Sequence, residues 1–127
     1  MSKILCIEDD HFIADIYVRA LKNADHEVTV IANGKEALSA AKEEVFDIIL
    51  LDLMLPDKSG IEILEELRGE NRDGMPHTKI IVTTNFEEPP EDRAKLEEMA
   101  DGYLIKADVT PSKLVELIDE LTEKDKV

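Results

Sequence analysis

The sequence predicts an α/β fold, a doubly wound five-stranded parallel sheet with five helices on its two faces. Short apolar runs alternate with segments whose apolar residues recur at helical spacing, from one end of the chain to the other. Strands that read as nearly continuous hydrophobic runs are typical of parallel sheets covered on both faces. The length of 127 residues fits one domain, and no repeat or linker divides the sequence.

Five segments are predicted as strands because they are short, apolar or β-branched, and bounded by polar or turn residues. In chain order they are residues 3–7, 27–31, 46–52, 79–84 and 102–105. The third is the most hydrophobic and ends at Asp52. We expect right-handed crossovers between these parallel strands.

Five further segments are predicted as helices, because their apolar side chains recur every three or four residues. These side chains are, helix by helix, Ile13, Ile16, Tyr17, Ala20 and Leu21; Ala37, Leu38 and Ala41; Ile61, Leu64 and Leu67; Leu96 and Met99; Leu114, Leu117, Ile118 and Leu121. Asp9 or Asp10 is suited to cap the first helix, and Pro111 to begin the last. The fourth helix, after the acidic loop 87–90, is expected to be short. Residues 1–122 are predicted to form the domain, with 123–127 as a polar tail.

Composition narrows the function classes. Hydrophobic residues make up 43% and charged residues 35%, which is neither a disordered nor a membrane composition. The apolar run at the N-terminus is too short for a signal peptide, and the single cysteine, Cys6, fits a reducing compartment. We therefore expect a cytoplasmic protein. The net charge of −15 repels phosphate backbones, so direct nucleic-acid binding is not expected.

Polar residues gather where the predicted strands end. Glu8 and Asp9 follow the first strand, Asp52 ends the third, Thr84 ends the fourth and Lys106 follows the fifth. Ligands of open parallel sheets bind outside these carboxyl ends, so the side chains are predicted to share one crevice. Mg²⁺ would relieve the repulsion between the carboxylates, since it prefers oxygen ligands. A carboxylate nucleophile beside it can accept a phosphoryl group as an aspartyl-phosphate.

Several segments resemble the receiver domain of response regulators, the chemotaxis-regulator-like switches of two-component signalling. The resemblance rests on ILCIEDD at residues 4–10, DIILLDLMLPDKSG at 47–60, IIVTT at 80–84 and GYLIK at 102–106. It covers essentially the whole chain in order, and the segment from Asp52 to Gly60 is its most specific part. The resemblance implies the strand order 2-1-3-4-5, with the site between strands one and three.

Carried over position by position, the resemblance implies a role for each site residue. Asp52 would be the phosphoacceptor, Asp9 would ligate Mg²⁺ directly and Glu8 would act through a water molecule. Asp52 and the backbone carbonyl of Met54 would complete the protein ligands. Lys106 would pair with the phosphoryl group.

The same resemblance implies a switch and a set of partners. The hydroxyl of Thr84 would move toward the phosphoryl group, although Thr83 would take its place if the register slipped by one residue. Tyr103 matches an aromatic residue that changes rotamer, but it also fits an ordinary half-buried strand position. The phosphodonor would be a sensor histidine kinase or a histidine phosphotransfer protein, and the output partner stays unknown. No membrane partner is expected.

Three departures from the family pattern bear on function. Asn85 stands where a small residue is usual, and it could narrow access for phosphodonors. Ala107 replaces a proline with a cis bond; a cis bond here would cost about 2.5–4 kcal/mol, so we expect trans. The loop 107–110 is one residue longer than usual. Met54 and Phe86 are both apolar at positions that tend to modulate phosphoryl lifetime, which favours slow hydrolysis.

Two other functions compete with a non-enzymatic switch. A Mg²⁺-dependent phosphohydrolase also forms an aspartyl-phosphate, but Met54 stands where such enzymes need a second aspartate. A degenerate receiver would bind partners without phosphorylation. The histidines His11, His26 and His77 share no metal-ligand spacing and are predicted to lie at the surface.

Overall fold

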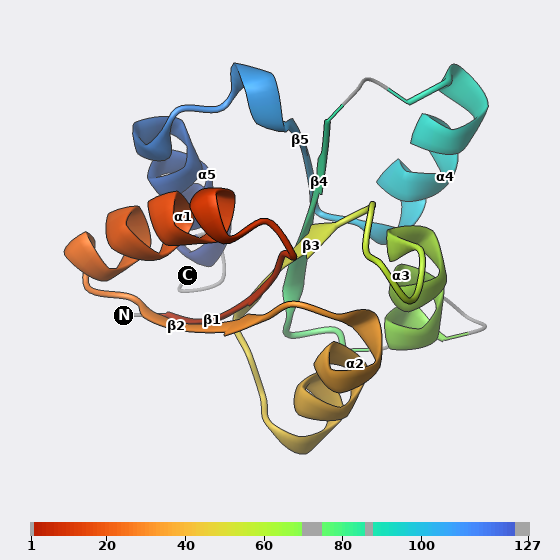
Figure 1. The fold of residues 1–127 in the computed structure, drawn as a ribbon, viewed down its shortest axis with the longest axis horizontal. Coiled ribbons are helices and arrows are strands. Elements are labelled where there is room, and N and C mark those ends of the chain that lie inside the picture. The colour runs from red at the N-terminus through yellow and green to blue at the C-terminus, as the bar shows by residue number, and fades with distance from the viewer. Residues whose placement is uncertain (1, 70–74, 86–87, 124–127) are drawn as a thin grey trace.

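A computed structural model describes residues 2–69, 75–85 and 88–123 of the chain. Within these residues the chain alternates strand and helix from end to end (Figure 1). The strands are β1 Lys3–Ile7, β2 Glu27–Ile31, β3 Ile48–Asp52, β4 Lys79–Thr84 and β5 Gly102–Ile105. The helices are α1 His11–Asn23, α2 Gly34–Glu43, α3 Gly60–Arg68, α4 Pro90–Met99 and α5 Pro111–Glu123, with a short 3₁₀ helix, η1 Lys106–Asp108, before α5.

All five strands are parallel and lie in the order β2-β1-β3-β4-β5, which confirms the predicted fold class and strand order. Ile7 pairs with Leu51 across β1 and β3, and Asp52 pairs with Thr83 across β3 and β4. Because β2 lies on the far side of β1 and β4 on the far side of β3, the chain leaves these two neighbouring strands in opposite directions. Loops that follow these two strands diverge and leave room for a site at this edge of the sheet.

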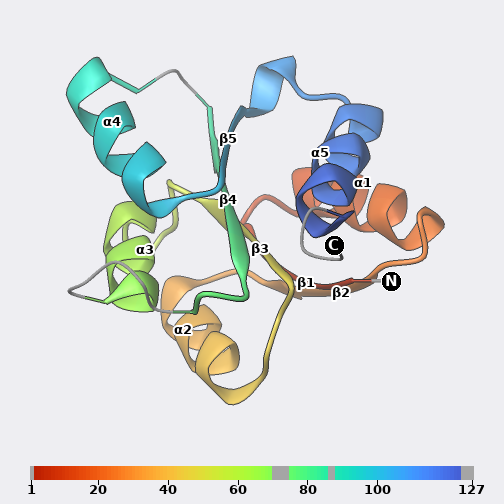
Figure 2. The ribbon, with the colours of Figure 1, turned by 180° about the vertical axis from the view of Figure 1, so that it is seen from behind.

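The helices form one layer on each face of the sheet. Helices α1 and α5 lie together on one side, and α2, α3 and α4 lie on the other (Figures 1 and 2). Successive side chains of β3 pack against opposite helix layers. Leu50 packs with Tyr17 of α1 and Leu114 of α5. Leu51 packs with Leu64 of α3. Every residue of β3 is buried, as expected for the central strand.

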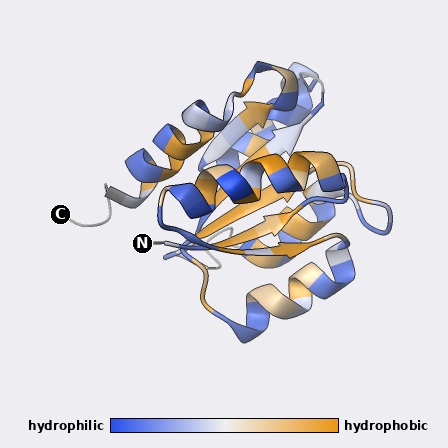
Figure 3. Ribbon diagram, turned by 60° about the vertical axis from the view of Figure 1, so that its left-hand side comes forward, coloured by the Kyte–Doolittle hydropathy of each residue, from blue (hydrophilic) through white to orange (hydrophobic). Residues whose placement is uncertain are grey.

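Hydrophobic residues dominate the strands and the sides of the helices that face the sheet, and the outward sides of the helices are mostly hydrophilic (Figure 3). Asp10, not Asp9, caps α1, because its carboxylate accepts hydrogen bonds from the backbone N–H groups of Phe12 and Ile13. The helix α4 has ten residues, as many as α2 and one more than α3, whereas α1 and α5 have 13 each. Of the helices described, none has the length and apolar character that a membrane span requires.

His26 lies in the interior, which corrects the prediction that it is a surface residue. Its Nδ1 accepts a hydrogen bond from the backbone N–H of Ser2 at 3.1 Å, and its Nε2 lies 3.1 Å from Oδ1 of Asp119. Helix α5 covers the start of β2 from far along the chain, a contact that local sequence does not reveal. The other two histidines, His11 and His77, are exposed as predicted.

Candidate functional site

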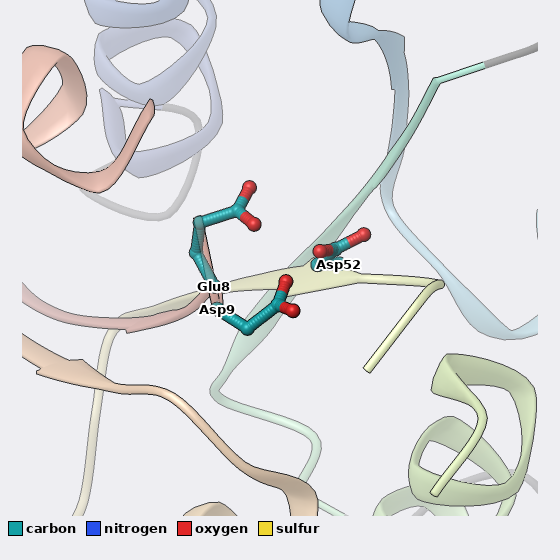
Figure 4. Close-up of side chains that lie close together, drawn as sticks. All are labelled: Glu8, Asp9 and Asp52. Carbon is teal, nitrogen blue, oxygen red and sulfur yellow. The ribbon is translucent and has the colours of Figure 1, made fainter. Parts of the chain in front are cut away.

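Three carboxylates converge at the carboxyl ends of β1 and β3. Glu8 and Asp9 lie on the loop after β1 and extend toward Asp52 at the end of β3 (Figure 4). One carboxylate oxygen from each residue lies within 4.8 Å of the others. Asp9 is exposed, whereas Glu8 and Asp52 are only 3% and 2% exposed. The predicted cluster therefore forms, with two buried members and one that reaches solvent.

The ammonium group of Lys106 reaches the same place from the end of β5. Its Nζ lies 2.7 Å from Oε1 of Glu8 and 3.2 Å from Oδ2 of Asp52. Burial by itself acts to lower the pKa of Lys106, but the contacts with the two carboxylates raise it overall. Lys106 is therefore a fixed positive charge against the Asp52 carboxylate.

Glu8 is held in an unfavourable environment for a carboxylate. Burial is the main cause that raises its pKa from 4.5 to about 7, and the neighbouring Asp52 adds to the effect. Lys106 and the backbone N–H of Asp10 act in the opposite direction. Although Oε1 of Glu8 lies close to Lys106, no well-directed hydrogen bond reaches this buried atom within the described part of the chain.

This donor set fits a hard divalent cation. Mg²⁺ is bound through carboxylate oxygens and keeps several waters, so two buried carboxylates with a third at the surface meet its needs. A cation would also compensate the negative charge of Asp52, which adds to the rise that burial causes in the pKa of Glu8. The residues present therefore match Mg²⁺ better than a softer metal, since the cluster contains neither histidine nor cysteine.

The loop after β3 fixes Asp52 through its backbone. The backbone N–H of Met54 donates to Oδ1 of Asp52 at 3.0 Å, and the N–H of Gly60 donates to the carbonyl of Leu53 at 3.0 Å. A side chain at position 60 would place its Cβ 2.5 Å from the Cα of Leu53 and 2.8 Å from the carbonyl oxygen of Asp52. Glycine is needed here because the start of α3 packs directly on the backbone of the site.

A hollow of about 440 Å³ opens beside the carboxylates and is lined in part by Asp9, Met54 and Pro56. Asn85 borders this region from the end of β4: its Nδ2 lies 4.0 Å from the sulfur of Met54, and both side chains are exposed. Whether Asn85 narrows the access of phosphodonors to the site stays a prediction. Phe86 lies outside the described residues.

The predicted switch residues lie at the same edge of the sheet and meet a residue that the sequence did not single out. Thr84 is buried, and its hydroxyl donates to Oε1 of Glu88 at 3.2 Å. Tyr103 is half-buried, and its hydroxyl oxygen accepts a hydrogen bond from the backbone N–H of Glu88 at 2.9 Å. Thr83 lies directly opposite Asp52 in the sheet.

Asp57 is a second residue that sequence reasoning missed. Its carboxylate accepts hydrogen bonds from the backbone N–H groups of Gly34 and Lys35, which lowers its pKa and ties the loop after β3 to the start of α2. The peptide bond before Ala107 is trans, as predicted, since the described residues contain no cis peptide.

A family comparison agrees with this fold. The model of the response regulator receiver domain matches residues 4–119, so the chain belongs to the family of response regulator receiver domains. Such domains are signalling modules of two-component systems that partner with histidine kinases, and they generally bind Mg²⁺ at an acidic pocket.

Two curated response regulators are similar to the chain in sequence. The chain is 35% identical over 106 residues to the response regulator ArlR of Staphylococcus saprophyticus, covering 84% of this chain and 46% of the relative. It is 34% identical over 105 residues to the DNA-binding response regulator MtrA of Mycobacterium leprae, covering 83% of this chain and 44% of the relative. The chain thus spans less than half the length of these relatives.

Solved structures match over nearly the whole chain. A CheY-like response regulator receiver domain protein from Methanospirillum hungatei superposes with a TM-score of 0.85 at 32% identity, covering 99% of this chain and 98% of that one. The chemotaxis protein CheY4 of Vibrio cholerae gives a TM-score of 0.82 at 29% identity, covering 95% of this chain and 98% of that one.

Proposed function

We propose that this domain is a phosphorylation-dependent switch that accepts a phosphoryl group on Asp52 with Mg²⁺ bound. A sensor histidine kinase or a histidine phosphotransfer protein would be the donor, and a conformational change would relay the signal to an output partner. One observation carries the proposal: the buried carboxylate of Asp52 lies 3.2 Å from Nζ of Lys106, with Glu8 and Asp9 beside it.

The proposed metal ligands lie at the carboxyl ends of β1 and β3 and on the loops that follow these strands. Asp9 and Asp52 would bind Mg²⁺ directly with the backbone carbonyl of Met54, and Glu8 would act through a water molecule. The exposure of Asp9 supports its role as a ligand, because an ion bound there stays in contact with solvent and Mg²⁺ keeps part of its water shell. When bound, the ion supplies positive charge that offsets the charge of the phosphoryl oxygens.

The transfer step needs positioning and charge neutralisation more than covalent chemistry from the protein. An oxygen of the Asp52 carboxylate forms a bond to phosphorus while the phosphorus–nitrogen bond of the donor histidine breaks, and the imidazole leaves with the electron pair. Lys106, which already pairs with Asp52, would then face a phosphoryl oxygen. The hydroxyl of Thr84 would donate to another, and Tyr103 would change its position with it.

This role is that of a signalling domain and not of an enzyme with turnover. The net charge of −15 argues against direct binding of nucleic acid by this chain, and we place the domain in the cytoplasm, where histidine kinases present their phosphoryl groups. The output partner would recognise the surface that changes on phosphorylation.

The test is incubation with Mg²⁺ and acetyl phosphate, followed by intact mass measurement. We expect a single phosphoryl adduct that hydroxylamine removes, since hydroxylamine cleaves acyl phosphates, and no adduct without Mg²⁺. Sustained release of nitrophenol from nitrophenyl phosphate would favour a phosphohydrolase instead. Absence of both adduct and Mg²⁺ binding would favour a receiver that acts without phosphorylation.

A further inference from the structure

Glu88 joins the two predicted switch residues through different groups. Its carboxylate oxygen Oε1 accepts the hydrogen bond of the Thr84 hydroxyl at 3.2 Å, and its backbone N–H donates to the hydroxyl oxygen of Tyr103 at 2.9 Å. The guanidinium of Arg93 lies 4.7 Å from the centre of the Tyr103 ring. Glu88 therefore links the end of β4 to β5 just before α4 begins at Pro90.

The contact between Glu88 and Thr84 competes with the role proposed for Thr84. A threonine hydroxyl has one proton to donate, so donation to the Glu88 carboxylate competes with donation to a phosphoryl group on Asp52. Thr83, and not Thr84, pairs with Asp52, and successive side chains of a strand point to opposite faces. Thr84 and Val82 are two positions apart, so their side chains point to the same face of the sheet, where Val82 and Tyr103 pack.

We propose that Glu88 is a positioning residue that holds Thr84 and Tyr103 in the unphosphorylated arrangement. The inference rests on the proposed function and deepens it, because it names the group that Thr84 must leave when Asp52 is phosphorylated. The carboxylate favours the inactive state, and its loss shifts the population toward the state in which Thr84 is available to the phosphoryl group.

A double-mutant cycle tests this role. The initial rate of adduct formation with Mg²⁺ and acetyl phosphate is measured for Glu88→Ala in the wild-type chain and in the Thr84→Val chain. In the wild-type chain we expect a roughly threefold to tenfold increase, given a bond to a charged acceptor that is somewhat long. In the Thr84→Val chain we expect no increase, because no hydroxyl remains to be held.

Glu91→Ala is the matched control for charge. Glu91 is an exposed acid in the first turn of α4 and has no side-chain hydrogen bond or ion pair with another described residue. Its removal takes away one negative charge from the same region, so its rate should stay within about twofold of wild type, as expected for a screened surface charge. An increase as large as that of Glu88→Ala would assign the effect to repulsion of the anionic donor and overturn the role of Glu88.

A second readout is taken on the unphosphorylated variant, with phosphorylated wild type as the reference. In threonine-labelled protein, the methyl signal of Thr84 in unphosphorylated Glu88→Ala should move from its wild-type position toward its position in the phosphorylated protein. An unmoved signal, or an equal rate increase in the Thr84→Val chain, would reject the role of Glu88 while leaving the adduct on Asp52 intact. If the wild type formed no adduct, the proposed function would fail, and the role of Glu88 would fail with it.

Discussion

Replacing Arg68 by methionine is predicted to destabilise the domain strongly, because Arg68 is a buried cation with a dense set of partners. The residue is 7% exposed. Its guanidinium donates to the carbonyl oxygens of Met99 at 2.8 Å, Met75 at 3.0 Å and Thr78 at 3.3 Å, and it pairs with Oδ2 of Asp101 at 2.8 Å. These bonds tie the end of α3 to the loop before β4 and to the end of α4.

The size of the loss follows from what the substitution leaves behind. Methionine matches the length of the arginine stem but offers no donor, so the Asp101 carboxylate and three carbonyl groups lose a partner. Removing one member of a buried ion pair costs about 3–5 kcal/mol. Because the Asp101 side chain keeps 31% exposure and still accepts the Ile80 N–H, we expect a value near the lower end, about 3 kcal/mol.

Urea unfolding with linear extrapolation measures the change, provided that the transition stays two-state. Lys58→Met is the matched control: Lys58 pairs with Glu66 at 2.7 Å, but both side chains are partly exposed, at 32% and 43%. Such a solvent-screened pair contributes little to the free energy of unfolding, so we expect a much smaller loss than for Arg68→Met. If Arg68→Met cost no more than Lys58→Met, the argument from burial would be refuted.

Three further predictions concern the site. Mg²⁺ at about 100 times its dissociation constant should add about 2.7 kcal/mol of stability and raise the Tm; Asp9→Ala should weaken this response, and an unchanged response would refute Asp9 as a ligand. Without metal, the raised pKa of Glu8, about 7 against an ordinary 4.5, stabilises the fold below pH 4.5, and this stability is lost as the pH rises through 7. Glu8→Gln should therefore flatten the pH dependence of urea unfolding in that window by about 1–3 kcal/mol, and an unaltered slope would contradict the assignment. Gly60→Ala should lower the free energy of unfolding in urea by about 1–3 kcal/mol and slow adduct formation, because the alanine Cβ would clash with the backbone of Leu53. A wild-type stability together with a wild-type rate would show that the loop adjusts without cost.

The elements that position the site could be predicted because their signals are local. Runs of apolar residues end at Glu8, Asp52 and Lys106, and a parallel sheet brings such ends to one edge whatever the details of packing. The cap of α1 could not be assigned between Asp9 and Asp10, since both precede the helix. Only the placement of the loop shows that Asp10 bonds the helix and leaves Asp9 to the cluster.

The contacts that sequence reasoning missed join residues far apart in the chain. Arg68 and Asp101 are 33 positions apart, and His26 and Asp119 are 93 apart. A buried arginine or histidine has no distinguishing pattern among its neighbours, so His26 was predicted to lie at the surface and Arg68 was not singled out. Glu88 was hidden for a different reason, because an acidic, proline-containing loop is more often solvated than structural.

If Asp52 is the phosphoacceptor, its replacement abolishes the adduct, which is measured as the intact mass of paired variants treated with Mg²⁺ and acetyl phosphate. Asp52→Asn is compared with Asp57→Asn, which alters an aspartate of the same loop but retains an oxygen to cap α2. We expect one phosphoryl adduct on wild type and Asp57→Asn, and none on Asp52→Asn. An adduct of equal yield on Asp52→Asn would contradict this role of Asp52.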